Sequence, residues 1–105
     1  MPLAAKFLDE AIRIDPKLAE AHYDKGLLLQ FQEQWSESIP ELETSIALKP
    51  EKARTHYRLA LAYARIGNRE KAKEQFALQK KYREQEKEGI DARYNEIQMF
   101  VVATK

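Results

Sequence analysis

The 105-residue sequence contains no cysteine, only three glycines and only four prolines. Without cysteine the chain can form no disulfide, perform no thiol chemistry and build no Cys-based metal site. An all-β sandwich would need turn residues about every 8 to 12 positions, so the scarcity of glycine and proline argues against many short strands. These absences favour a helical domain without covalent cross-links.

Long apolar runs and a large excess of charge of one sign are also missing. No stretch approaches the roughly eighteen uncharged apolar residues of a membrane span, and no basic segment followed by an apolar run opens the chain. We therefore expect no membrane contact and no signal peptide. The net charge of +1 is too small for nonspecific attraction to nucleic acid. The compartment stays open, with the cytoplasm favoured.

The composition provides enough apolar material for one small core. Hydrophobic residues make up 44% and charged residues 33% of the sequence, which is typical of a globular, helix-rich domain. The charge is divided unevenly, because residues 1–48 hold four Lys or Arg and nine Asp or Glu, whereas residues 49–105 hold fourteen and eight. Interspersed surface charge is the commoner explanation, but the asymmetry would also favour an acidic partner or head-to-tail association of copies.

A 34-residue repeat organises the chain. Pro16 and Pro50 lie 34 residues apart, and the same spacing relates Ala19 to Ala53, His22 to His56, Tyr23 to Tyr57, and Leu27 to Leu61. Apolar residues recur at steps of three and four within each period, which is helical spacing. The pattern predicts antiparallel helices at about 3–14, 18–32, 36–48, 53–66 and 69–88.

Residue types at fixed repeat positions make the sequence resemble the tetratricopeptide repeat (TPR) family. Counted from Ala53, the last repeat has the types that the family prefers at His56, Leu59, Ala60, Tyr63, Gly67, Ala72 and Phe76. The resemblance implies an all-α, right-handed superhelical solenoid of antiparallel helix pairs, in a single domain over residues 1–105. It also implies the second helix of a partial repeat at 3–16 and full repeats at 19–52 and 53–86.

Small residues and prolines have expected structural roles. Gly26 and Ala60 are expected where two helices cross, because a larger side chain would force the axes apart. Pro40 is expected in the first turn of its helix, where little hydrogen bonding is lost.

The C-terminal end departs from the repeat pattern. Glu84 replaces the closing proline, so the last helix is expected to run on to near Gly89. Asp91 is a candidate N-cap of a further helix whose apolar stripe is Ile90, Tyr94, Ile97 and Val101. Alternatively, the uncharged end at residues 97–104 could pair as a strand. We interpret residues 89–105 as a capping or self-association segment.

No pattern typical of catalysis or of cofactor binding occurs. His22 and His56 occupy the same repeat position without a carboxylate or cysteine at metal-ligand spacing, so packed histidines are preferred over a metal-ligating or pH-sensing role. Three scattered glycines form no dinucleotide or phosphate-binding loop. Trp35 is expected to hold two helices together rather than to stack on a base. We predict a protein that is not an enzyme and binds no cofactor, metal or nucleic acid.

The concave face of such a solenoid is the predicted binding site. By resemblance to the TPR family, the residues that point into this groove include Tyr23, Leu27, Gln30, Phe31, Arg54, Tyr57, Arg58, Leu61 and Arg65. Tyrosine and arginine often contribute most to interfaces, so the predicted function is a non-catalytic scaffold that binds a partner's peptide with apolar and acidic side chains. Ordinary exposed residues without a binding role are the alternative.

Other functions stay open. Arg54 and Arg58 match two basic positions of TPR proteins that bind chaperone carboxylate ends, but Asp24 stands where those proteins have asparagine, so we do not expect a chaperone clamp. The helix at 3–14 lacks a hairpin mate, which makes self-assembly through residues 3–14 or 90–102 the runner-up. A piece of a longer TPR array in a multi-protein complex is a further alternative.

Overall fold

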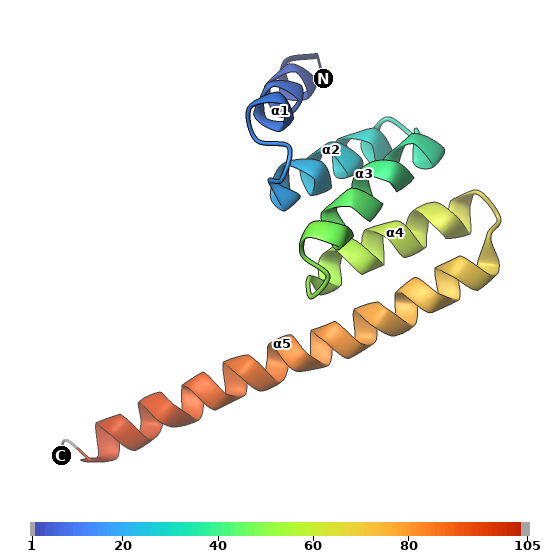
Figure 1. Cartoon of the computed structure of the whole chain (residues 1–105). Helices are drawn as coiled ribbons and strands as arrows, with labels where there is room; N and C mark the ends of the chain where they lie inside the picture. The colour runs from blue at the N-terminus through green and yellow to red at the C-terminus, as the bar shows by residue number, and fades with distance from the viewer. Residues whose placement is uncertain (1, 104–105) are drawn as a thin grey trace.

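The computed structural model describes the backbone of residues 2–103 and the side chains of residues 3–97. Within this part of the chain all regular structure is helical, in the order α1 (Pro2–Ile14), α2 (Ala19–Phe31), α3 (Trp35–Leu48), α4 (Ala53–Arg65) and α5 (Arg69–Ala103). Each helix packs against the next one along the chain, and the short connectors reverse the chain direction (Figure 1). The predicted all-α class is confirmed.

The core lies where α2, α3, α4 and the start of α5 meet. Its buried members are Tyr23, Leu42, Leu59, Tyr63 and Ala72. Gly26 shows why α2 and α3 can approach closely, because a Cβ at this position would lie 2.7 Å from Cγ and Cδ2 of Leu42. The expectation that a small residue is needed at this crossing is confirmed.

Equivalent turns connect α2 to α3 and α4 to α5. Glu33 follows α2 and Gly67 follows α4, and both have positive φ, of 61° and 87°. The next amide donates back to the helix in each turn, as in the 2.9 Å hydrogen bond from Asn68 N–H to the Tyr63 carbonyl. This arrangement satisfies carbonyls that would otherwise be free at the helix C-terminus.

Pro40 differs from the expectation. Because α3 begins at Trp35, Pro40 lies in the second turn of the helix and not in the first. A proline at this place removes one amide donor of the helical ladder.

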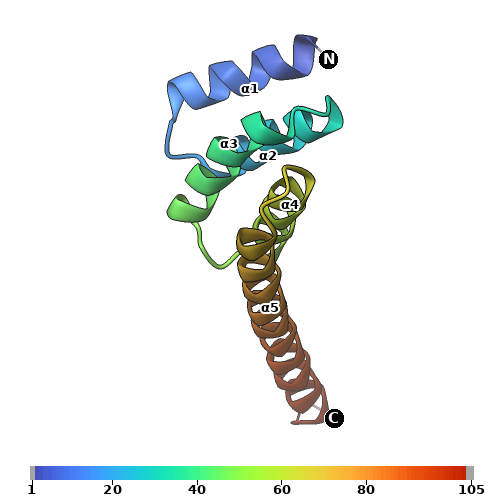
Figure 2. The same cartoon turned by 90° about the vertical axis from the view of Figure 1, so that its right-hand side faces the viewer.

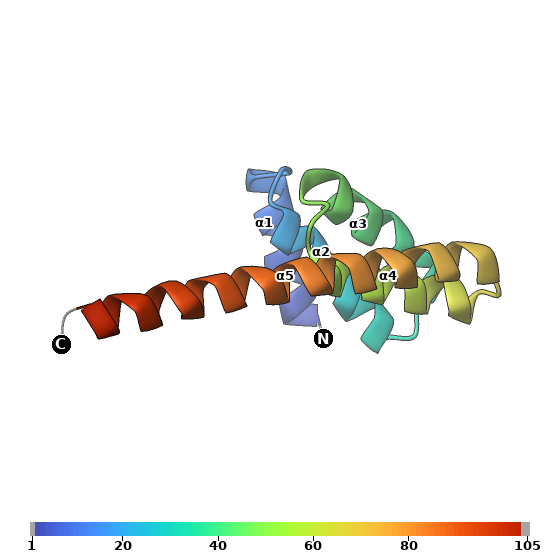
Figure 3. The same cartoon turned by 90° about the horizontal axis from the view of Figure 1, so that it is seen from below.

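The predicted helix break at Gly89 is wrong. α5 is one continuous helix that extends far beyond α4 (Figures 2 and 3). Gly89 has no positive φ, and a glycine costs an exposed helix only about 1 kcal/mol, which the surrounding helix-forming residues offset. We call residues 86–103 of α5 the overhang.

Two further expectations for this region are also wrong. Asp91 lies inside α5, so it caps no second helix, and the backbone is helical through Ala103 instead of forming a strand at 97–104. The exposed stripe of the overhang comprises Ile90, Tyr94 and Ile97, whereas the side chain of Val101 lies outside the described residues.

Candidate functional site

The nine predicted groove residues come from α2 and α4, the first helices of the two predicted full repeats, and these helices contact each other. α2 carries Tyr23, Leu27, Gln30 and Phe31, and α4 carries Arg54, Tyr57, Arg58, Leu61 and Arg65. Phe31, Arg54, Tyr57 and Arg65 are exposed, and Leu27, Arg58 and Leu61 are half-buried. Phe31, with 76% of its surface exposed, is the largest uncovered apolar group of the set.

Gln30 and Tyr23 are buried instead of lining an open surface. The Gln30 amide donates to the Arg58 carbonyl at 2.8 Å and lies 3.4 Å from the Ser38 hydroxyl, so this side chain ties α2 to α4. Tyr23 belongs to the core, and the Arg54 guanidinium covers its ring at 4.5 Å from the centroid. Gln30 is therefore a packing residue, while Tyr23 contributes its ring beneath Arg54.

The three groove arginines rest on aromatic rings. Besides Arg54 over Tyr23, Arg58 lies 5.8 Å from the Tyr57 ring centroid and Arg65 lies 4.9 Å from the Trp35 ring centroid. An arginine whose guanidinium lies over a ring can still donate from its N–H groups to a carboxylate. Trp35 is thus bridged to α4 through Arg65, which agrees with its expected role between helices.

A cleft of about 560 Å³ adjoins the groove where the two proline turns lie close to the start of α4. Its lining residues are Lys17, Leu18, Ala19, Glu20, Tyr23, Ser45, Lys49, Lys52, Arg54, Thr55 and Glu86. Arg54 forms an ion pair with Glu20 at 3.1 Å, and the Glu86 carboxylate accepts the Ala53 N–H at 3.2 Å. Lys17, Lys49 and Lys52 form no ion pair with a described residue, so the cleft has an excess of positive charge.

These three lysines are not among the site residues predicted from the sequence. Each lies within two residues of Pro16 or Pro50, in the connectors between repeats. The sequence does show lysines next to both Pro16 and Pro50. Because equivalent turns of a solenoid lie side by side, these lysines could have been predicted to share one site. Only Tyr23 and Arg54 belong to both the predicted groove and the cleft.

Acidic groups border the groove near Arg54. Burial raises the pKa of Asp24, and the nearby Glu20 carboxylate raises it further, whereas Arg54 acts in the opposite direction. Burial also raises the pKa of Tyr63 to about 12, helped by the hydrogen bond from its hydroxyl to Glu43. α4 is thus held against acidic side chains of the preceding repeat.

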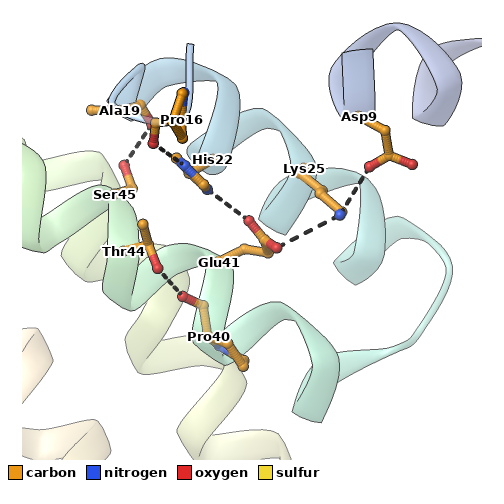
Figure 4. A network of polar contacts seen from close by, with 9 residues as sticks. All are labelled: Asp9, Pro16, Ala19, His22, Lys25, Pro40, Glu41, Thr44 and Ser45. Carbon is orange, nitrogen blue, oxygen red and sulfur yellow. Dashed lines mark hydrogen bonds and ion pairs between the residues drawn. The ribbon is translucent and has the colours of Figure 1, made fainter. Parts of the chain in front are cut away.

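The first histidine, His22, holds helices and a turn together. Its ring nitrogens lie 2.8 Å from the Pro16 carbonyl and 2.9 Å from the Glu41 carboxylate of α3. Glu41 also faces Lys25, whose ammonium pairs with Asp9 of α1 at 2.9 Å (Figure 4). That bond is the main reason why the pKa of Lys25 is raised.

His56 repeats this arrangement one period later. It lies 2.7 Å from the Pro50 carbonyl and 2.7 Å from Gln75, and its ring stacks on Tyr82 with centroids 5.2 Å apart. Both histidines are therefore buried packing residues, as the preferred interpretation predicted. The described residues contain no group of three or more His, Cys, Asp or Glu that could hold a metal ion.

A family model matches the chain over residues 3–95, which is most of the sequence and includes every residue of the groove and the cleft. The model describes the bacterial transcriptional activator domain (BTAD). The chain belongs to the BTAD family. The TPR resemblance thus identified a helical-repeat fold, while the family that matches is BTAD.

Solved structures of MamA share the fold of this BTAD chain. A crystal structure of MamA has 26% identity and a TM-score of 0.76, and the match covers 80% of this chain and 49% of that chain. MamA RS-1 ArsTM double mutant has 25% identity and a TM-score of 0.75 over 81% of this chain and 48% of that chain. MamA MSR-1 C2, at 21% identity, has a TM-score of 0.74 over 81% and 49%.

The chain spans about half the length of these MamA chains. The likeness confirms the predicted fold class, a TPR-like solenoid of antiparallel helix pairs. No curated protein matches the sequence. Among the described residues, none of the helices of this BTAD domain is both long and apolar enough to cross a membrane.

Proposed function

We propose that this BTAD domain is a non-catalytic interaction module that holds a segment of a partner protein along α2 and α4. The observation that carries the proposal is the row of three arginines, each lying over an aromatic ring, beside a cleft whose lysines have no ion-pair partner among the described residues. Stacked arginines and exposed aromatic rings are the groups that most often contribute binding energy at interfaces. The proposed ligand is a peptide segment that carries both acidic and apolar side chains.

Charge and exposure match such a segment. Lys17, Lys49 and Lys52 offer ammonium groups to carboxylates, and the exposed ring of Phe31 offers an apolar contact at the other end of α2. The lysines of the cleft form a short cluster, whereas binding along nucleic acid needs a longer track of phosphate contacts. Absence of nucleic acid from the interface is therefore part of the proposal.

The family name adds a biological setting to the proposal. Because the family is the bacterial transcriptional activator domain, we propose that the partner segment takes part in transcriptional activation. The module would then supply a protein contact, with no catalytic role of its own.

The test is capture of the partner by the full chain followed by charge reversal in the groove. The double variant Phe31→Ala, Arg65→Glu is expected to bind the partner with an affinity at least about tenfold lower, since both side chains lie in the groove. The matched control is Ile66→Ala, Arg69→Glu, which makes a comparable apolar truncation and the same charge reversal in the exposed α4–α5 connection and at the start of α5. Equal capture by the groove variant and the control would contradict the proposal.

Self-assembly is the second candidate function, and uncovered apolar side chains favour it. Leu3 and Phe7 of α1 are 65% and 68% exposed, and Ile90, Tyr94 and Ile97 of the overhang are also largely uncovered. In the expected region 90–102 the side chains after Ile97 lie outside the described residues. Light scattering tests this candidate: a strict monomer at millimolar concentration contradicts it, and an oligomer that Phe7→Ser or Ile90→Ser dissociates supports it.

A further inference from the structure

The 34-residue repeat relates one covered face of the molecule to an uncovered one. Tyr23 and Leu42 are 9% and 0% exposed, whereas their repeat equivalents Tyr57 and Phe76 are 39% and 38% exposed. Tyr57 and Phe76 lie edge to face with ring centroids 6.3 Å apart. We define Tyr57 and Arg58 of α4 together with Phe76 of α5 as the end face.

The structure shows what covers the face formed by Tyr23 and Leu42, which we call the inner face. α4 lies on it, with Leu59 and Tyr63 in the same core cluster as Tyr23 and Leu42. In the described part of the chain, α5 contacts no helix other than α4, so nothing occupies the corresponding place over the end face (Figures 1 and 2). An amphipathic helix that packs as α4 does on the inner face would therefore fit on the end face.

The charges of the two faces are opposite. On the inner face, Arg54 pairs with Glu20 and lies near Asp24. The repeat equivalents of Glu20 and Asp24 are Arg54, whose guanidinium is held on the inner face by Glu20, and Arg58, which belongs to the end face. A helix that covers the end face must therefore present a carboxylate where α4 presents Arg54, since a cation there would meet the like charge of Arg58.

We propose that the end face docks an amphipathic helix of a partner protein, with an acidic residue in its first turn. By the register of Arg54, Leu59 and Tyr63 in α4, this helix carries a leucine five residues after the acidic one and an aromatic residue nine after it. No described segment of this chain has that pattern. We therefore assign the end face to a helix of a partner protein, and the experiment below tests a second copy separately.

Tyr57 and Arg58 also belong to the proposed groove, but Phe76 of α5 lies outside it, so the inference extends the binding surface onto α5. The probe is a fluorescent, helix-stapled peptide of residues 53–65 that carries Arg54→Glu, titrated with the full chain by anisotropy. Stapling is needed because an isolated helix of this length is marginal in water. The comparison peptide keeps Arg54. We expect saturable binding of the glutamate peptide and at least about tenfold weaker binding of the arginine peptide.

Protein variants locate the binding. Phe76→Ala and, separately, Arg58→Glu should each lower the affinity for the glutamate peptide about tenfold. The groove variant Phe31→Ala, Arg65→Glu should bind this peptide with unchanged affinity. The second variant keeps the test decisive if Phe76→Ala unfolds α5. Absence of saturable binding, equal affinity for the two peptides, or insensitivity to both end-face variants overturns the proposal. A dimer of the free chain that dissociates on Phe76→Ala would assign the face to a second copy and also overturn it.

Discussion

Two turn residues meet the same backbone requirement with different side chains. Glu33 and Gly67 both adopt the left-handed conformation, which costs a residue with a Cβ roughly 1–2 kcal/mol and costs glycine little. Because Glu33 is exposed, its side chain contributes little packing. We expect Glu33→Gly to raise the free energy of unfolding by about 0.5–1 kcal/mol and Gly67→Glu to lower it by a similar or larger amount. Urea denaturation of both variants measures the difference, and two changes of the same sign would contradict it.

Tyr63 makes the stability depend on pH in the alkaline range. Its pKa is raised to about 12 in the folded chain by burial and by its hydrogen bond to Glu43, whereas an unfolded tyrosine titrates near 10. A raised folded pKa gives stability that is fully present below pH 10 and is lost as the pH rises toward 12. Tyr63→Phe should therefore show a smaller loss of stability between about pH 9.5 and 12 than the unmodified chain. Tyr94→Phe, on the exposed overhang, is the matched control and should keep the original dependence.

At the scale of helices, the sequence predicted boundaries well wherever a strong local signal exists. α1 to α4 begin and end within about two residues of the predicted positions, since Pro16, Pro50 and Gly67 mark three of the connections. Gly89 was a weaker signal, because a single exposed glycine does not end a helix without a positive φ or a following proline.

The groove shows a different limit of sequence reasoning. The repeat register assigned the right helices, but exposure at a given position depends on whether a further helix lies against it. Tyr23 and Tyr57 occupy the same register, yet only Tyr23 is covered, by Arg54 from the next repeat. Gln30 was assigned to the surface although it bonds across to α4, because a single repeat does not reveal what its neighbour offers.

Replacing a glycine by alanine should change the stability in opposite directions at Gly26 and at Gly89. Gly26→Ala places a Cβ against buried Leu42, so we expect the free energy of unfolding to fall by about 1–2 kcal/mol. Gly89→Ala meets no atom within 4 Å and should raise the helical stability of α5 by about 0.5–1 kcal/mol. Urea denaturation measures the first change and circular dichroism on heating the second. A gain of stability in Gly26→Ala would contradict the close approach of α2 and α3.

The whole molecule is elongated and unevenly supported. Its radius of gyration is 17.3 Å, against about 13 Å for a compact domain of this size, and its longest extent is 55 Å. α3 and α4 are packed by helices on both sides, whereas among the described residues α1 contacts only α2 and much of the overhang contacts no other helix (Figure 3). In a solenoid each unit is stabilised mainly by its neighbours, so stability should fall toward both ends.

Hydrogen exchange should follow this gradient. We expect amides of α3, of α4 and of the first turns of α5 to be the most protected, and amides of α1 and the overhang to exchange fastest, because opening these ends breaks the fewest tertiary contacts. Asp9→Asn removes the charge partner of Lys25, which joins α1 to α2, and should accelerate exchange in α1 while leaving α4 unchanged. The control Glu10→Gln removes an exposed carboxylate that pairs with Arg13 inside α1 and should affect α1 less. Equal protection of all five helices would show that the molecule opens as one cooperative unit, or that its ends are covered in solution, and would contradict the nearest-neighbour account.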